Sequence, residues 1–376
     1  MGLGRAVASF RSKLHWRLHR MFVDQWHCSR PFTKSGARRL LLISSERRIA
    51  RSQTHLFFRF RRQIEQTFGL QIRELSVQAF EQGAPRWNPA ADTVVVQPWL
   101  DVTGQRLQQL LEMVHERCSP TRVVYLDSFA PTDLRLGQCV DPYVDFYVKK
   151  HVLRDRSLYG KPTKGDTNLM DYFGQRFGID HEVVCHSVSE ALLSKLLVGP
   201  SFATADFMLR AFESNCSPAP PQKDIDVHAR IETVGTDWYM AMRREAQEAI
   251  DAVEGLVCVT GNGVPHAQYM EEMARSKVCL SPFGYGEVAW RDYEAIMCKA
   301  LLLKPDCSHI DVDPDIFVPF ETYVPLKWDF SDLQSKLRHY LHNPAERERI
   351  TEAAFERLHH YYSGHEYLTQ LRRVFE

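Results

Sequence analysis

The stretch at residues 277–306 constrains the fold most, because it combines the patterns of a strand, a turn, a helix and a second strand. Val278-Cys279-Leu280 is a short apolar run, typical of a buried parallel strand. Residues 281–286 interrupt it, since proline removes a backbone donor and glycine permits a tight turn. Residues 287–299 then have a helical pattern, and 300–303 are again apolar. The sequence therefore predicts a βαβ unit, whose loop lies where open α/β sheets bind ligands.

Two charged residues of this unit suggest what the ligand is. Arg291 and Glu294 are three positions apart, so on a helix they share one face. The amino-terminal end of a helix suits a phosphate, and Arg291 could add a forked donor for diphosphate oxygens. Glu294 could accept hydrogen bonds from two adjacent ribose hydroxyls. The alternative is an ordinary surface ion pair, which this spacing also produces.

The same stretch resembles a known family. Its motif consists of a loop with Pro, an aromatic residue and Gly, then R-x-x-E-A, and this chain has Pro282, Phe283, Gly284, Arg291, Glu294 and Ala295 in that order. It is similar to the carboxy-terminal half of GT-B glycosyltransferases of the exostosin-like and CgeB-like branches (glycosyl transferases group 1). Two features differ: Lys299 replaces the usual Gly, and Glu287 and Glu294 are seven apart where many related transferases have eight. The resemblance covers about residues 225–362.

The rest of the chain fits two α/β domains. Apolar strand patterns at 38–45, 93–97 and 122–127 alternate with helical patterns at 55–68 and 104–118, which argues for a parallel sheet. The 376 residues suffice for two domains, and the proline-rich segment 214–224 reads as the linker. The resemblance implies GT-B architecture: two Rossmann-like domains facing a cleft, with C-terminal helices crossing back to the N-terminal domain. The predicted parts are 1–36 (basic amphipathic helix), 37–213 (acceptor domain), 214–224 (linker), 225–345 (nucleotide-sugar domain) and 346–376 (C-terminal helices).

The amino-terminal segment is basic and amphipathic. Residues 1–23 contain five Lys or Arg and no acid, with apolar residues at helical spacing. This pattern predicts either docking on an anionic membrane surface or packing on the protein's own body. No run approaches the roughly 20 apolar residues of a membrane span. The nine scattered Cys are typical of thiols in a reducing compartment, so we expect a cytoplasmic protein, peripheral at the inner membrane face if the helix docks there.

The resemblance implies a glycosyltransferase that moves a sugar from a nucleotide-diphosphate donor to a glycan, lipid-linked or polysaccharide acceptor. A nucleotide-sugar epimerase on the same fold, or a non-catalytic sugar-binding or scaffolding subunit, are the alternatives. The predicted nucleotide-sugar site consists of Arg230, Gly284, Tyr285, Glu287, Arg291 and Glu294. Arg243 and Arg244 are further candidates for the diphosphate, but their position also fits a solvated helix face.

The catalytic base of an inverting reaction would come from the first domain. Asp127 follows a predicted strand and is our candidate, with Asp101 and His151 as rivals. The alternative is that Asp127 caps the turn after the strand.

Cofactors and other partners follow from composition. Lys plus Arg total 47 and Asp plus Glu total 47, so we expect no nucleic-acid partner. Asp311-Val312-Asp313 is a D-x-D triplet, which some transferases use to bind a divalent metal, but so short a match is weak. The 16 His show no zinc-binding spacing. We therefore expect no metal and no cofactor besides the sugar donor.

Overall fold

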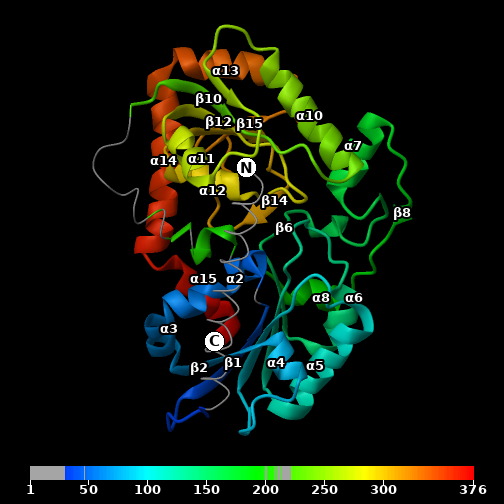
Figure 1. The fold of residues 1–376 in the computed structure, drawn as a ribbon. Coiled ribbons are helices and arrows are strands. Elements are labelled where there is room, and N and C mark those ends of the chain that lie inside the picture. Colours follow the sequence, from blue (N-terminus) through cyan, green and yellow to red (C-terminus); the bar gives the residue numbers. More distant parts are fainter. Residues whose placement is uncertain (1–29, 46, 200, 207, 210–211, 213–221) are drawn as a thin grey trace, which may run out of the picture. The chain divides into compact units, whose positions relative to one another are not determined.

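The computed structural model describes residues 30–376 except 46, 200, 207, 210–211 and 213–221 (Figure 1). The predicted amino-terminal helix and most of the predicted linker lie outside these residues. The described chain divides into two compact units. The first contains residues up to Ser128, Cys139–Val148 and Val374–Glu376, and the second contains Phe129–Gln138 and Lys149–Arg373.

The first unit is built on a parallel sheet in which β2, β1, β3, β4 and β5 are neighbours in that order. Its core is apolar because β1 contributes Leu40 to Ile43, all fully buried. The elements are β1 Arg38–Ser44, α2 Arg48–Arg59, α3 Arg61–Phe68, β2 Leu70–Ser76, α4 Val77–Glu81, β3 Thr93–Gln97, α5 Gly104–Cys118, β4 Arg122–Leu126 and β5 Phe146–Lys149.

The second unit is built on a parallel sheet with the order β11-β10-β12-β13-β15. The elements are α6 Gly137–Val140 (shared with the first unit), β6 His151–Leu153, β7 Thr163–Lys164, α7 Asn168–Phe177, β8 Val183–Val184, α8 Glu190–Lys195, β9 Leu196–Val198, β10 Ile225–Ala229, α10 Asp237–Asp251, β11 Cys258–Thr260, α11 His266–Ala274, β12 Ser276–Leu280, α12 Trp290–Met297, β13 Leu301–Pro305, β14 Ile310–Val312, β15 Val324–Leu326, α13 Leu333–His342, α14 Pro344–Ser363 and α15 Glu366–Phe375. Short 3₁₀ turns occur at Asp141–Tyr143, Arg156–Leu158 and Phe202–Thr204.

The core of the second unit explains why these segments form a sheet. Alternate residues of β10, β12 and β13, such as Val227, Val278 and Leu301, are fully buried. The helix α10 covers this core with an apolar stripe that includes Ala246 and Ile250. In Figure 1, α10 and α13 lie beside the strands of this sheet, and α14 packs on β13. The predicted α/β class with two parallel-sheet domains is confirmed.

The last three residues of the chain belong to the first unit. Two of them, Val374 and Phe375, end the helix α15, and the rest of α15 belongs to the second unit. In the first unit, Arg38 and Arg122 donate hydrogen bonds to the carbonyls of Phe375 and Val374. The end of α15 is therefore hydrogen-bonded to the first residues of β1 and β4.

The division between the units differs from the predicted domain bounds. Residues 149–213 were predicted within the first domain, but the described part of this segment belongs to the second unit. The reason is tertiary: β6 pairs antiparallel with β14, and α7 packs against α10. Local patterns do not reveal such partners. The strand β14, for example, lies more than a hundred residues from β6 along the chain.

Among the described residues, no helix has both the length and the apolarity to cross a membrane. The described cysteines form no disulfide; four of them are buried, and Cys185 is exposed.

Candidate functional site

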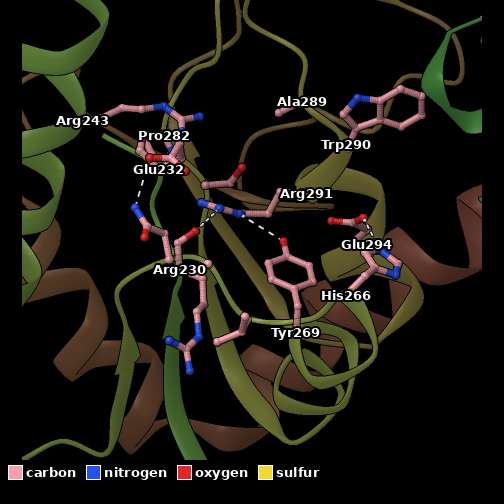
Figure 2. A pocket seen from close by; sticks show the side chains of 14 residues that line it. Arg230, Glu232, Arg243, His266, Tyr269, Pro282, Ala289, Trp290, Arg291 and Glu294 are labelled. Atoms are coloured by element: carbon pink, nitrogen blue, oxygen red, sulfur yellow. Dashed lines mark hydrogen bonds and ion pairs between the residues drawn. The ribbon is translucent and has the colours of Figure 1, made fainter. Parts of the chain in front are cut away.

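A pocket of about 400 Å³ lies at the carboxyl ends of the strands of the second sheet (Figure 2). Its lining follows three of these strands: Arg230 after β10, Asn262 after β11 and Ser281 after β12. The strand β10 is first in sequence but lies between β11 and β12, so the strand order reverses here. Ligands bind open α/β sheets at such switch points. The volume lies within the range of small-molecule sites.

The helix α12 brings two of the predicted residues to this pocket, Arg291 and Glu294. It begins at Trp290, later than the sequence suggested, because the side chain of Asp292 accepts a hydrogen bond from the backbone N–H of Ala289 at 2.7 Å. The same carboxylate accepts from Ser281 Oγ at 2.6 Å and forms an ion pair with Lys304 at 3.1 Å. Asp292 and Lys304 are fully buried. This pair anchors the start of α12 to the ends of β12 and β13.

Arg291 lies at the centre of the pocket (Figure 2). Its Nε donates to Tyr269 Oη at 3.2 Å, Nη1 donates to the carbonyl of Leu280 at 3.4 Å, and Nη2 donates to the carbonyl of Arg230. These bonds use three of the five N–H donors of a guanidinium. The acceptors are a hydroxyl and two carbonyls, so they fix the guanidinium without neutralising its charge.

Glu294 has a buried carboxylate with few contacts. The residue is 6 % exposed, and no described residue donates a hydrogen bond to it. Its nearest polar neighbour is His266 Nε2, at 3.6 Å from Oε1. The alternative interpretation, a surface ion pair between Arg291 and Glu294, does not form; both side chains line the pocket. A buried carboxylate without donors is ready to accept hydrogen bonds from hydroxyls of a ligand.

Arg230 lines the pocket, but its guanidinium is already paired. Nε and Nη2 donate to the two carboxylate oxygens of Glu272, both at 2.8 Å, and Nη1 donates to the carbonyl of Thr260. In Figure 2 the side chain runs away from Arg291, while its carbonyl accepts from Arg291. The role predicted for Arg230 in binding diphosphate stays a prediction.

Arg243, which sequence reasoning ranked below Arg230, also lines the pocket. It is 7 % exposed and donates to the carbonyls of Phe283 and Glu232, both at 3.1 Å. Burial, and after it the nearby charge of Arg291, lower the pKa of Arg243 to about 10. The signal was in the sequence: Arg243 follows Tyr239 by four positions, on the face of α10 that packs inward.

The remaining predicted nucleotide-sugar residues are not among those that line this pocket. Tyr285 is 44 % exposed and stacks on Tyr239 with ring centroids 4.5 Å apart. Gly284 and Gly286 shape the turn before α12. A Cβ on Gly286 would lie 2.0 Å from the carbonyl oxygen of Ala130, whereas one on Gly284 would meet nothing closer than 3.5 Å.

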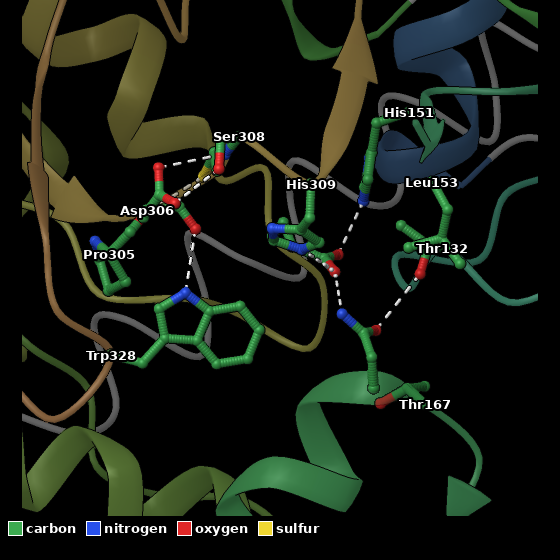
Figure 3. A network of polar contacts seen from close by, with 12 residues as sticks. Thr132, His151, Leu153, Thr167, Pro305, Asp306, Ser308, His309 and Trp328 are labelled. Carbon is green, nitrogen blue, oxygen red and sulfur yellow. Dashed lines mark hydrogen bonds and ion pairs between the residues drawn. The ribbon is translucent and has the colours of Figure 1, made fainter. Parts of the chain in front are cut away.

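Glu287 lies in a separate, buried polar network, and Figure 3 shows two of its partners, His151 and His309. His151 Nε2 lies 3.0 Å and His309 Nε2 3.2 Å from its carboxylate, and Asn168 donates to it at 3.0 Å. Burial raises the pKa of this carboxyl, but the hydrogen bonds from His151 and His309 outweigh burial and hold the pKa well below 4.5. Burial lowers the pKa of His151. Glu287 joins β6, α7 and the segment after β13, and it is fully enclosed in this structure.

Asp127, the predicted base, is in the first unit at the end of β4. It is fully buried and accepts a hydrogen bond from Tyr147 Oη at 2.8 Å. Its catalytic role stays a prediction. Of its rivals, His151 belongs to the Glu287 network and Asp101 is an exposed partner of Arg106.

The first residue of the D-x-D triplet forms ion pairs. Asp311 pairs with Arg154 at 3.0 Å and with Arg156 at 3.2 Å. In the described part of the chain, no three His, Cys, Asp or Glu side chains are grouped as metal ligands would be.

The fold and the pocket define a class: an α/β unit with a polar ligand site at the switch point of its sheet. Comparison with known proteins shows which family resembles the chain in this region. Residues 220–373 match the model of a glycosyl transferase-like family. The match includes the whole pocket.

Several solved structures are similar to this chain, and three are described here. A T4 phage BGT with its UDP-glucose substrate has a TM-score of 0.45 and 11% identity, covering 89% of this chain and 98% of that one. An alpha-glucosyltransferase in complex with UDP and a 13-mer DNA has a TM-score of 0.47 and 9% identity, covering 86% and 95%. TarM has a TM-score of 0.43 and 12% identity, covering 76% and 54%.

No curated protein sequence matches the chain significantly. The comparisons do not bear out the expectation of no nucleic-acid partner, which rested on charge balance and stays a prediction.

Proposed function

We propose that the chain is a glycosyltransferase that binds a nucleotide-diphosphate sugar in the pocket of the second unit. The observation that carries this proposal is the arrangement of Arg291 and Glu294: a fixed cation and a carboxylate without hydrogen-bond donors line one pocket at a switch point. A nucleoside diphosphate needs both, since its diphosphate is anionic and its ribose presents two adjacent hydroxyls. The family match over 220–373 supports the same class of reaction.

The helix geometry supports the placement of the diphosphate. The starts of α11 and α12 both contribute to the pocket, through His266 and through Ala289 to Arg291. Backbone N–H groups at a helix start have no partner within the helix and favour an anion. The diphosphate would therefore lie near Arg291, and the ribose near Glu294.

The chemistry follows from these contacts. In sugar transfer the diphosphate leaves with its negative charge, and fixed cations stabilise that charge in the transition state. The side chain of Arg291 is held by three hydrogen bonds, so it needs no reorganisation when the bond to the sugar breaks. In this proposal arginine side chains, and not a metal ion, stabilise the leaving diphosphate. We therefore expect transfer to continue in the presence of EDTA.

The finer assignments rest on sequence. They are a GT-B arrangement, membership of the exostosin-like or CgeB-like branch, transfer of a hexosyl group, and a glycan, lipid-linked or polysaccharide acceptor at the inner membrane face. The motif from Pro282 to Ala295 and the basic segment 1–23 support them.

A thermal-shift screen against uridine, guanosine, cytidine and thymidine diphosphates tests the proposal first. A ligand at a hundred times its dissociation constant stabilises the folded protein by about 2.7 kcal/mol, which such a screen detects. The matching nucleotide sugars are then incubated with the protein alone and with candidate acceptors. Transfer to an acceptor supports the proposal; an epimerised sugar without acceptor, or no stabilisation by any of the four diphosphates, would refute it.

A further inference from the structure

The buried carboxylate of Glu287 fixes how two imidazole rings carry their protons. Burial raises the pKa of Glu287, but the hydrogen bonds from His151 and His309 outweigh burial and keep the carboxyl ionised at neutral pH. An ionised carboxylate only accepts hydrogen bonds. His151 Nε2 lies 3.0 Å from Oε2, and His309 Nε2 lies 3.2 Å from Oε1 (Figure 3). Each Nε2 therefore carries a hydrogen, and Nδ1 is the nitrogen of each ring that can take up a further proton.

The two Nδ1 atoms differ in what can reach them. His151 is 2% exposed, and its Nδ1 is buried without a hydrogen-bond partner. His309 is 24% exposed; its Nδ1 is not buried, and no described residue forms a hydrogen bond with it. Of these two rings, His309 combines a fixed tautomer with a nitrogen that a substrate can reach. A carboxylate on one side of an imidazole and an open nitrogen on the other is the arrangement of an oriented general base.

The ring of His309 is also held in place. It packs against Trp328, with ring centroids 5.3 Å apart, and the indole Nε1 of Trp328 donates to the carbonyl of Asp306 at 3.0 Å. In addition, Asn168 donates to the Glu287 carboxylate at 3.0 Å, which fixes the group to which His309 is bonded. A base that is positioned before the reaction needs little reorganisation when the proton is transferred.

The dyad of His309 and Glu287 lies on the same edge of the second sheet as the pocket. The strands β12 and β13 are parallel neighbours. Pocket residues Ser281 and Pro282 follow β12, and His309 follows β13, so all three come after the carboxyl ends of these strands. Glu287 lies in the loop between β12 and α12, whose two ends line the pocket. A sugar whose diphosphate is bound in the pocket would therefore be brought to the edge that carries the dyad.

We propose that His309 is the general base of the transfer reaction and that Glu287 is its positioning residue. The oxygen of an acceptor hydroxyl attacks the anomeric carbon of the donor, and the hydroxyl proton passes to His309 Nδ1. The bond from that carbon to the diphosphate oxygen breaks, and its electron pair leaves with the diphosphate. The negative charge of Glu287 stabilises the imidazolium that forms. This inference rests on the proposed function, requires inversion at the anomeric carbon, and gives His309 the role that the sequence suggested for Asp127.

Several other charged or titratable groups lie on the elements around the dyad. They are His151 with its neighbours Lys149 and Lys150, Tyr159, Asp306, and the ion pair of Arg154 with Asp311. In the described part of the chain, Glu287 is the carboxylate that pairs with His309. Because the other groups stay in place when His309 is replaced, a change in the pH profile on that replacement reports the loss of this ring.

The first test measures transfer by the full chain with the best donor and acceptor. His309→Gln should lower kcat by roughly 10²–10⁴, the usual contribution of a general base, and should leave the dissociation constant of the nucleoside diphosphate close to the wild-type value. The wild-type rate should fall between about pH 8 and pH 5, where imidazoles take up a proton, and His309→Gln should lose this dependence. The product should have the inverted anomeric configuration.

Two further histidines serve as controls. His360→Gln on α14 removes the ring of an exposed His–Glu pair, with 3.1 Å between His360 Nε2 and Glu366 Oε1, and should leave kcat unchanged. His151→Gln removes the second imidazole on the Glu287 carboxylate and should lower kcat far less than His309→Gln, because its ring is enclosed. Equal losses in the His151 and His309 variants would show that both rings merely support Glu287, and would overturn the assignment of His309 as the base.

A second measurement needs neither donor nor acceptor. Diethyl pyrocarbonate acylates accessible, unprotonated imidazole nitrogens, and mass spectrometry locates the label. In the wild type we expect label on His309 and none on His151, and slower labelling of His309 in Glu287→Gln. Protection of His309 in the wild type would overturn the proposal even if the His309 variants did not fold.

The outcomes separate the base from the proposed function. Wild-type kcat in His309→Gln, or retention of the anomeric configuration, would overturn the base and leave the glycosyltransferase proposal intact. Absence of both transfer and nucleoside diphosphate binding in the wild type would overturn the proposed function, and the role of His309 as base with it.

Discussion

Replacing Glu294 by Gln is the sharpest test of how the pocket binds a nucleotide. No described residue donates a hydrogen bond to the carboxylate, so apart from the ion pair with His266 at 3.6 Å the variant loses ligand contacts and no protein contacts. A hydrogen bond to a charged group contributes about 1.5–3 kcal/mol. Two ribose hydroxyls would therefore contribute about 3 kcal/mol at the lower end, which corresponds to roughly a hundredfold in the dissociation constant.

The assay compares two proteins, wild type and variant, with two ligands. Calorimetry measures the dissociation constants of wild type and Glu294→Gln for the best nucleoside diphosphate and for its 2′,3′-dideoxy analogue. We expect the hundredfold loss for the ribose ligand and almost none for the dideoxy ligand, since the contacts are absent from the start. Glu271→Gln serves as control, because that side chain on α11 is 71% exposed.

One result would refute the reasoning: the same loss for both ligands. The carboxylate would then act through the charge of the pocket or through His266, and not through the ribose hydroxyls. An unchanged affinity for both ligands would place the nucleotide elsewhere.

Three further predictions concern stability. Lys304→Met should lower the free energy of unfolding in urea by about 3–5 kcal/mol, because it leaves Asp292 buried without its partner; the double variant with Asp292→Asn should lose less, and equal losses would contradict the argument. Gly286→Ala should lower the melting temperature by several degrees, whereas Gly284→Ala should change it little, because only the first Cβ collides with backbone. Glu287→Gln should destabilise the protein at pH 7. The pKa of Glu287 is depressed in the folded state, so its contribution is present above pH 4.5 and is lost as pH falls toward the folded pKa. The gap in urea midpoint between wild type and Glu287→Gln should therefore narrow between pH 5 and pH 3.5, and a constant gap would contradict the assignment.

Local patterns were enough for much of the second sheet. The apolar runs at 278–280 and 301–303 form β12 and β13, and the helix between them places Arg291 and Glu294 on one face, as their spacing predicted. These elements follow from periodicity and from residue types that stop a strand or begin a helix, which are properties of neighbouring residues.

The strand β2 shows where local patterns fail. It is fully buried although it contains Arg73 and Glu74, and the apolar patterns predicted no strand there. Arg73 donates to the carbonyls of Arg30 and Pro31, and Glu74 accepts from Ser44 at 2.7 Å. Burial of these charges depends on partners that lie about thirty to forty residues away, so the sequence around β2 does not announce it.

The sequence by itself determined the α/β class, the βαβ unit and the shared face of Arg291 and Glu294, because each depends on residues within one or two helical turns. Only the tertiary structure decided which arginine of the pocket forms an ion pair. Glu272, 42 residues from Arg230, pairs with that guanidinium, while α10 brings Arg243 to the pocket, where it donates hydrogen bonds to the carbonyls of Phe283 and Glu232. Charge balance in a buried site is a sum over neighbours in space, and spacing along the chain does not specify those neighbours.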